Sequence, residues 1–195
     1  MRIFKANRLD IWVRIALAIS VGIVALQANY IRRLQIETDS LAARGAVREG
    51  LQVPDTDALD LSGKRAVVSY GATSQPTVIY VFRPGCLWCE RNEKAVNSFA
   101  KQISNRYRII GLSLSDDGLT DFLKAHPVSF PVYHSPSPSL TASLNLGTTP
   151  ETIAVSPTGR VLASWNGTYL GATQSGIERF FSISLTNAPV TGSGS

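Results

Sequence analysis

Residues 78–93 constrain this chain most, because an apolar run there is followed by Pro84-Gly85 and then by two cysteines that open a helical pattern. The apolar run predicts a buried strand over 77–82, and the pattern after it predicts a helix over 86–104. The first turn of a helix carries positive potential, which lowers the pKa of a cysteine thiol from about 8.5. Cys86 is therefore the expected nucleophile. Cys89 follows one helical turn later, so it can attack a mixed disulfide formed at Cys86.

Two other roles are open to this pair, which comprises both cysteines of the 195-residue chain. A structural disulfide is one, but a loop this small constrains the unfolded chain little. A zinc site is the other, but it needs four ligands, and the remaining histidines, His126 and His134, have no partner ligand at close spacing. The residues favour a redox pair, and we predict neither a metal site nor an organic cofactor.

The formal charge of +5 raises the question of a nucleic-acid partner. Nucleic-acid binding leaves an electrostatic footprint in which basic residues cluster on one face or along one helix. Here the lysines and arginines are scattered, and no basic tract is interleaved with aromatic residues. The sequence therefore predicts no nucleic-acid partner.

The N-terminal part predicts a single-pass membrane protein. Residues 1–14 form a basic tail, and residues 15–31 (IALAISVGIVALQANYI) are almost free of charge. As a helix these residues rise about 25 Å, near the short limit for a membrane span. We interpret 15–31 as an uncleaved transmembrane signal anchor, with a cleaved signal peptide and a buried core helix as alternatives. The basic tail favours an inner-membrane protein whose domain lies in the periplasm or another extracytoplasmic space.

The rest of the chain divides into three parts. Residues 32–52 carry alternating charges and good helix formers, which predicts a solvated stalk or linker. Residues 53–185 predict the folded domain. Residues 186–195 are rich in Ser, Gly and Thr, which is typical of a disordered tail.

Within the domain, strand and helix patterns alternate. We expect strands over 66–70, 77–82, 107–114, 130–134, 151–156 and 160–165. Helices are expected over 86–104, over 117–126 after the cluster at 115–117, and from Ser137-Pro138 to 144. The pattern Ser175-Gly-Ile-Glu178 predicts a capping box that opens a last helix ending near 185. This order predicts an α/β sandwich with a mixed central sheet flanked by helices and preceded by the N-terminal transmembrane helix.

The domain resembles the thioredoxin superfamily, and most closely its membrane-anchored TlpA-like and redoxin-type thiol-disulfide oxidoreductases. Three motifs carry the resemblance across residues 53–185. They are the cysteine motif at 81–89 (VFRPGCLWC), the segment at 146–153 (LGTTPETI), and the turn at 156–162 (SPTGRVL) with Gly167 after it. The resemblance implies a thioredoxin-like fold.

The resemblance also implies a site around the cysteines. In the family a cis-proline preceded by a small residue faces the pair, and Thr149-Pro150 fits that position. The backbone of Thr149 would then pair with an extended substrate segment. Leu87 and Trp88, between the cysteines, would dock a partner, although Trp88 could equally pack into the domain. An ordinary trans proline at Pro150 is the alternative.

Two departures from the family concern the proton acceptor for the second cysteine. Tyr80 stands where thioredoxins carry a buried acid, and Asn92 stands where many TlpA-like proteins carry a glutamate. Removing the proton of a buried thiol needs an acceptor. Glu93 is the first candidate and Glu151 the second. Arg83 and Arg91 would add positive potential near Cys86.

These observations predict a membrane-tethered, extracytoplasmic oxidoreductase. It would act on protein thiols and disulfides and exchange electrons with a membrane donor or acceptor. A peroxiredoxin-like peroxidase is one alternative, but Arg83 stands where the peroxidatic motif has Thr or Ser. A copper chaperone using Cys86, Cys89 and His134 is the non-enzymatic alternative. The direction of electron flow stays open, because redox poise varies widely among such proteins.

Overall fold

The computed structural model describes residues 8–45 and 49–185. The predicted tail at 186–195 and the first seven residues of the predicted basic tail lie outside the described residues. The chain separates into two units, Met1–Arg44 and Gly45–Ser195, and each is described here by itself.

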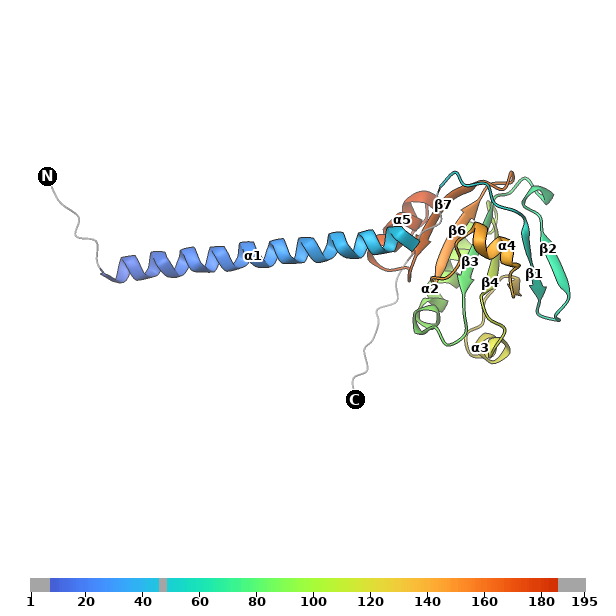
Figure 1. Ribbon diagram of the computed structural model, residues 1–195, viewed down its shortest axis with the longest axis horizontal. Coiled ribbons are helices and arrows are strands. Elements are labelled where there is room, and N and C mark those ends of the chain that lie inside the picture. Colours follow the sequence, from blue (N-terminus) through green and yellow to red (C-terminus); the bar gives the residue numbers. More distant parts are fainter. Residues whose placement is uncertain (1–7, 46–48, 186–195) are drawn as a thin grey trace. The chain divides into compact units, whose positions relative to one another are not determined.

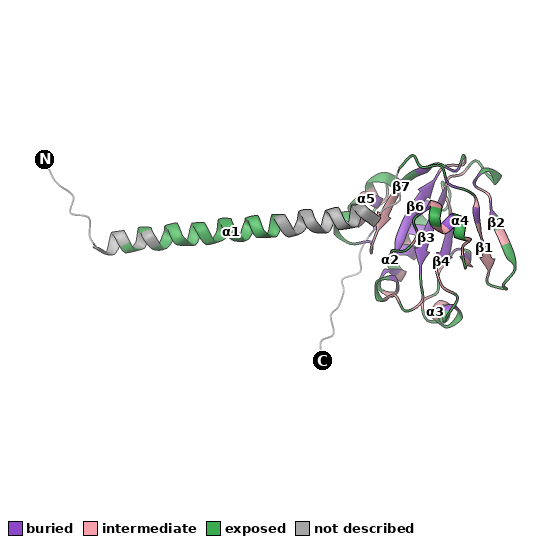
Figure 2. Cartoon of the chain, viewed as in Figure 1, coloured by how far each residue is buried: buried purple, intermediate pink, exposed green. Residues whose placement is uncertain are grey.

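The first unit consists of helix α1 (Arg8–Gly45), which continues through the predicted anchor and most of the predicted stalk (Figure 1). Apolar side chains along its middle are exposed (Figure 2), among them Leu17, Val21, Val24 and Leu26. Across residues 8–45 and 49–185, no helix combines the length and the hydropathy needed to cross a bilayer. The transmembrane anchor predicted over 15–31 is therefore not confirmed.

The second unit is built on one seven-stranded sheet, in the order β2-β1-β5-β4-β3-β6-β7. The central strand β3 pairs parallel with β4 and antiparallel with β6, which confirms the mixed sheet. The strands are β1 (Thr56–Asp60), β2 (Arg65–Val68), β3 (Thr77–Phe82), β4 (Arg108–Ser113), β5 (Val132–His134), β6 (Glu151–Val155) and β7 (Val161–Asn166).

Helices pack on both faces of this sheet (Figure 1). They are α2 (Leu87–Ile103), α3 (Leu119–Ala125), α4 (Pro138–Ser143) and α5 (Gly171–Phe181), with a short 3-10 turn, η1 (Tyr70–Ala72). Successive side chains of a strand point to opposite faces. On β3, Tyr80 therefore packs with α2, α3 and α5, while Ile79 packs with α4. The expected α/β sandwich with flanking helices is confirmed.

Aromatic rings fill the sheet face under α2. Tyr80 stacks on Phe82 with ring centroids 5.9 Å apart and meets Phe130 edge to face at 6.3 Å. Gly111 of β4 lies beneath these rings. A Cβ atom there would come within 3.1 Å of the Phe130 ring and 3.2 Å of the Phe82 ring. The absent side chain at Gly111 is what lets the two rings lie against the sheet.

The start of the domain differs from the prediction. The strand expected over 66–70 ends at Val68, and Tyr70 begins the 3-10 turn. Strand β1 was not predicted, because its sequence TDALD has few apolar residues and two aspartates. These aspartates have local partners. Asp57 accepts two hydrogen bonds from the Arg65 side chain, at 2.9 and 2.8 Å, across the β1–β2 hairpin.

The predicted capping box at Ser175-Gly-Ile-Glu178 is wrong. The N-cap of helix α5 is Leu170, five residues before the predicted N-cap, so Ser175 lies inside the helix. Glu178 does not reach back to the helix start. Its Oε1 accepts hydrogen bonds from the Leu185 backbone N–H at 2.7 Å and from the Gln174 side chain at 2.9 Å. The glutamate therefore holds the segment after the helix.

Helix α3 starts later than predicted, and the predicted N-cap of α4 is confirmed. The helix expected from residue 117 begins at Leu119, because Ser115 Oγ accepts the Asp117 N–H in a turn before the helix. The N-cap predicted at Ser137 is confirmed, since its hydroxyl accepts the Leu140 N–H at 3.3 Å and Pro138 occupies the first helical position.

Candidate active site

The cysteine pair lies at the start of α2. Cys86 is the N-cap residue, with extended backbone angles, and the helix begins at Leu87. The preceding Gly85 has a φ of 71°, a conformation that glycine adopts without strain. Cys86 and Cys89 form a disulfide with a Cα–Cα distance of 5.2 Å. Cys86 is half-buried and Cys89 is 3% exposed, so an incoming sulfur reaches Cys86 more readily.

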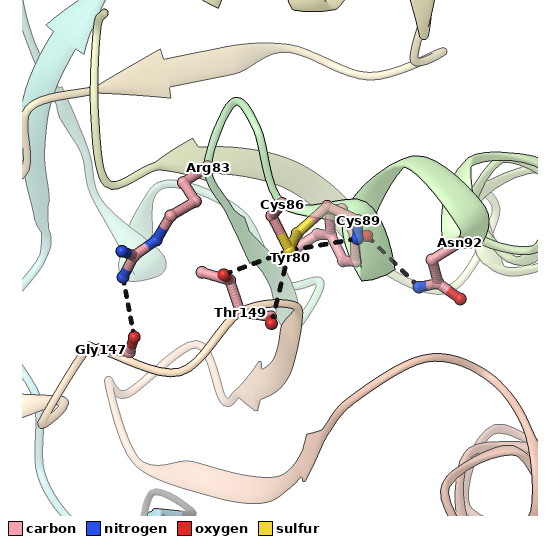
Figure 3. The surroundings of a disulfide bond; sticks show 7 residues. All are labelled: Tyr80, Arg83, Cys86, Cys89, Asn92, Gly147 and Thr149. Atoms are coloured by element: carbon pink, nitrogen blue, oxygen red, sulfur yellow. Dashed lines mark hydrogen bonds between the residues drawn. A yellow bond between two sulfur atoms is a disulfide. The ribbon is translucent and has the colours of Figure 1, made fainter.

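Two hydrogen-bond donors point at Cys86 Sγ (Figure 3). The Cys89 backbone N–H donates to it at 3.2 Å, and the Thr149 hydroxyl donates at 3.4 Å. After reduction the same donors would favour the thiolate over the thiol, because hydrogen bonds to a charged sulfur stabilise the charged form. The N-terminus of α2 adds positive potential at the same atom.

The peptide bond between Thr149 and Pro150 is cis, which confirms the prediction for this dipeptide. The Thr149 carbonyl oxygen lies 3.6 Å from Cys86 Sγ, so the cis-proline segment faces Cys86. Arg83 is exposed, and its Nη2 donates to the Gly147 carbonyl at 2.9 Å (Figure 3). This bond ties the turn before the cysteines to the segment before Thr149.

The two residues between the cysteines are exposed, Leu87 by 51% and Trp88 by 52%. Trp88 therefore does not pack into the domain core. The Arg91 guanidinium lies over the Trp88 ring, 5.1 Å from its centroid, as a cation–π contact. Arg91 is itself exposed, so the positive charge and the indole form one surface feature beside Cys86.

Neutral groups occupy both positions where the family carries acids. Asn92 is 2% exposed; its Nδ2 donates to the Tyr80 hydroxyl at 3.3 Å and its Oδ1 accepts the Tyr169 N–H at 2.8 Å. Burial raises the pKa of Tyr80 and Tyr169 well above the ordinary value, so both phenols are neutral at physiological pH. These two positions therefore supply no carboxylate beside Cys89.

Glu93 lies on the next position of α2 and meets His126 at the end of α3. Glu93 Oε2 is 3.1 Å from His126 Nδ1, and the two side chains are 26% and 28% exposed. Both line a small cavity of about 10 Å³ together with Cys89, Tyr80 and Phe82. His126 was missed as a site residue because 33 positions separate it from Glu93, and no local motif marks it.

The second predicted acceptor, Glu151, is elsewhere. It is fully buried at the start of β6, in register with Val81 of β3 and Asn166 of β7. It does not line the cavity beside Cys89. Of the two predicted carboxylates, the structure therefore brings only Glu93 to the cavity beside Cys89.

His134, a ligand in the copper-chaperone alternative, has partners on both ring nitrogens. Nε2 lies 3.0 Å from the Asp60 carbonyl oxygen, and Nδ1 lies 3.0 Å from Ser135 Oγ. Within residues 8–45 and 49–185, no three His, Cys, Asp or Glu side chains gather as a metal-binding group. The geometry does not favour a copper site that uses His134.

The chain was compared with known proteins in three ways. No family model matches it, and no curated protein matches it. Among solved structures it is similar to the thioredoxin domain of a thiol-disulfide oxidoreductase from Bacteroides vulgatus, with a TM-score of 0.57 and 15% identity over 70% of this chain and 99% of that one. It is also similar to a thiol:disulfide interchange protein from Bacteroides sp., with a TM-score of 0.56 and 15% identity over 70% and 91% of the two chains.

A third similar structure is StoA from Bacillus subtilis, with a TM-score of 0.51 and 17% identity over 65% of this chain and 97% of that one. At this level of identity the likeness concerns the fold. The shared fold and the disulfide at the N-terminus of α2 agree with the sequence motifs. The domain of this chain therefore has the thioredoxin-like fold, with a Cys-x-x-Cys disulfide opening its α2 helix.

Proposed function

We propose that this protein is a thiol-disulfide oxidoreductase that acts on protein thiols and disulfides. One observation carries the proposal: in the Cys86–Cys89 disulfide, Cys86 is the accessible sulfur and receives two hydrogen bonds, while Cys89 is buried behind it. A structural disulfide does not require its two sulfurs to differ in exposure and hydrogen bonding, whereas a redox pair needs one nucleophile and one resolving thiol. Two of the similar structures are named as a thiol-disulfide oxidoreductase and a thiol:disulfide interchange protein, which supports the same activity.

The reaction follows from the positions of the two sulfurs. In the reducing direction, the Cys86 thiolate attacks a substrate disulfide, one S–S bond forms at Cys86, and one substrate sulfur leaves as a thiolate. Cys89 then loses its proton and attacks Cys86 Sγ, which releases the second substrate thiolate and forms the Cys86–Cys89 disulfide. Two electrons pass to the substrate. The oxidising direction is the same sequence reversed.

The surface around Cys86 fits a protein substrate. An extended substrate segment would hydrogen-bond to the Thr149 backbone beside the cis-proline, which aligns its sulfur with Cys86. The exposed Leu87 and Trp88 offer apolar area for the same partner. Arg91, stacked on Trp88, favours substrates with acidic residues near the disulfide.

The location of the protein is part of the proposal. We propose that residues 15–31 tether the chain to the inner membrane, with the domain on the extracytoplasmic side and a membrane electron donor or acceptor as its redox partner. The exposed apolar side chains of α1 and the basic residues before them support this. A tethered chain stays in the membrane pellet after alkaline carbonate extraction, and protease added to spheroplasts digests its domain. Release into the supernatant by carbonate, or protection of the domain, contradicts the proposal.

The alternatives are not favoured. A peroxidase would place a hydroxyl three residues before its reactive cysteine, but that position holds Arg83, whose side chain binds the Gly147 carbonyl. A copper chaperone would need His134, whose ring nitrogens both have partners.

Insulin reduction by the detergent-solubilised full chain tests the activity. We expect catalytic reduction of insulin disulfides with dithiothreitol as reductant, and loss of this activity in Cys86→Ser. The Cys89→Ser variant should instead accumulate mixed disulfides through Cys86, and these would identify the partners. Peroxide consumption without insulin reduction would overturn the proposal in favour of a peroxidase.

A further inference from the structure

We propose that Glu93 and His126 together are the proton-exchange site of Cys89, taking up its proton when it attacks and returning one when it leaves. This inference rests on the proposed function. It adds to it a residue from α3's C-terminal end that no sequence motif indicated, and it assigns the two neutral positions Tyr80 and Asn92 a purely structural role.

A proton acceptor is needed because Cys89 is 3% exposed and packs against the aromatic core. A thiol in apolar surroundings resists ionisation, and only the thiolate attacks a disulfide. Water outside the domain cannot take the proton directly from a sulfur this buried. The acceptor must therefore lie in the cavity that Cys89 lines.

The cavity contains few groups that can change protonation state. Apart from Cys89, its titratable lining groups are Tyr80, Glu93 and His126, and its other lining residues are apolar. Burial raises the pKa of Tyr80, and its hydroxyl oxygen already accepts a hydrogen bond from Asn92, so it does not take up a proton as a phenolate. The carboxylate of Glu93 and the imidazole of His126 are what remain.

Cys89 and Glu93 both line the cavity, whose volume of about 10 Å³ is near the size that one water molecule needs. The Glu93–His126 contact at 3.1 Å lets the two groups share one proton. His126 is held in place, because its backbone N–H donates to the Phe122 carbonyl at 2.7 Å and its ring lies 5.0 Å from the Phe122 ring.

His126 also connects the cavity with the outside. It lines a second, open depression on the surface, together with Glu90, Asp117 and Gly118. One imidazole thus borders both the small cavity beside Cys89 and the solvent-facing depression. The proton lost by Cys89 passes to the Glu93–His126 pair and leaves to solvent from the imidazole. In the oxidising direction the same pair delivers a proton to the departing Cys89 thiolate.

The test distinguishes the two cysteines by the order in which they react. Reduced full chain is mixed with the chromogenic disulfide dithionitrobenzoate, which supplies the oxidant. Attack by Cys86 releases one coloured thiolate in a first phase, and attack by Cys89 on the resulting mixed disulfide releases a second. We expect Glu93→Gln to slow the second phase about tenfold to a hundredfold near pH 7, with the first phase unchanged. His126→Asn should slow it less and shift its dependence on pH.

Three further variants make the result specific. Glu90→Gln removes the same charge from the same helix at a residue that lines the open depression and not the cavity beside Cys89, so its second phase should match the wild type. Glu93→Asp keeps a carboxylate and should restore part of the rate. The Cys89→Ser variant should release a single equivalent, which assigns the second phase to Cys89.

The outcomes distinguish a failure of the proton-exchange site from a failure of the proposed oxidoreductase function. If the wild-type protein shows no second phase, the proposed oxidoreductase mechanism fails. If the wild type shows both phases and folded Glu93→Gln, checked by circular dichroism, keeps the second at its normal rate and pH profile, the proton-exchange site is wrong. Should Glu93→Gln fail to fold, His126→Asn and Glu93→Asp decide, and an unchanged pH profile in both overturns the inference.

Discussion

The Thr149 hydroxyl donates a hydrogen bond to Cys86 Sγ over 3.4 Å, although 63 positions separate the two residues in the sequence. The donor comes from the segment before β6 and the acceptor from the start of α2. Because this hydroxyl contacts the sulfur directly, we expect Thr149 to affect the reactivity of Cys86.

Replacing that hydroxyl should make Cys86 less reactive. Thr149→Val keeps the shape of the side chain but removes a donor, so the pKa of the Cys86 thiol rises. The first phase with dithionitrobenzoate should slow about tenfold near pH 6. It should approach the wild-type rate at alkaline pH, where the Cys86 thiol is ionised in both the variant and the wild type. Thr148→Val, at the exposed neighbour, is the control. Equal rates for Thr149→Val and wild type near pH 6 would contradict the role of this hydrogen bond.

Asn92→Ala should destabilise the domain. The change leaves the buried Tyr80 hydroxyl and Tyr169 N–H without their partner, and an unpaired buried group costs about 1 to 3 kcal/mol. Urea unfolding should show a free energy of unfolding lower by about 2 kcal/mol or more. Lys94→Ala, an exposed change on the same helix, should stay within about 0.5 kcal/mol of the wild type. A loss for Asn92→Ala no larger than that of the control would rule out a structural role for this amide.

Trp88→Ala should separate substrate docking from chemistry. The ring is 52% exposed, so its loss should leave the free energy of unfolding nearly unchanged. Reduction of insulin should slow about fivefold or more at low substrate concentration, while the small disulfide dithionitrobenzoate reacts at the wild-type rate. Leu162→Ala, an exposed apolar change on β7, is the matched control. Equal slowing with both substrates would show that Trp88 affects Cys86 itself.

Glu178 should make stability depend on pH. Hydrogen bonds from the Gln174 side chain and the Leu185 N–H lower the pKa of its carboxyl below the ordinary value of 4.5. A lowered folded-state pKa stabilises the fold above that ordinary value, and this contribution is lost as the pH falls through the folded-state pKa. The melting temperature of Glu178→Gln should therefore lie below that of the wild type at neutral pH, and the gap should close as the pH falls through the lowered folded-state pKa of Glu178.

The exposed pair Asp121 and Lys124 supplies the comparison for that experiment. A surface ion pair contributes little, so Asp121→Asn should show a small gap at every pH. A gap for Glu178→Gln that widens toward acid pH would have the wrong sign and would contradict the assigned hydrogen bonds.

The centre of the fold could be predicted from the sequence, because local signals there agree with the packing. The strand at 77–82 is continuously apolar and is buried on both faces, and its predicted bounds match β3. The cis bond at Thr149-Pro150 was expected from a motif of the thioredoxin superfamily that the sequence resembles. These elements surround Cys86, so its position and its surroundings could be predicted from the sequence.

The edges of the fold could not be predicted in the same way. Strand β1 lies near the sheet edge, and its aspartates are satisfied by Arg65 and the hairpin turn, which no apolar pattern reveals. Helix α5 starts after Leu170 without a side-chain cap, so the Ser175–Glu178 pattern misplaced its start. The contact between Glu93 and His126 depends on how α2 and α3 pack, and sequence spacing holds no information about that distance.

Gly111 limits how the surroundings of Cys89 can vary. Any side chain at that position would push the Phe82 ring, which lines the cavity beside Cys89. A substitution at Gly111 would therefore disturb the packing of the rings and could not change the surroundings of Cys89 by a small amount. Variation has to come from α2 and from the end of α3, where Glu93 and His126 are partly exposed and can be exchanged without repacking the core. Around the buried sulfur of Cys89, the side formed by the sheet is thus fixed by packing, while the side formed by α2 and the end of α3 can change.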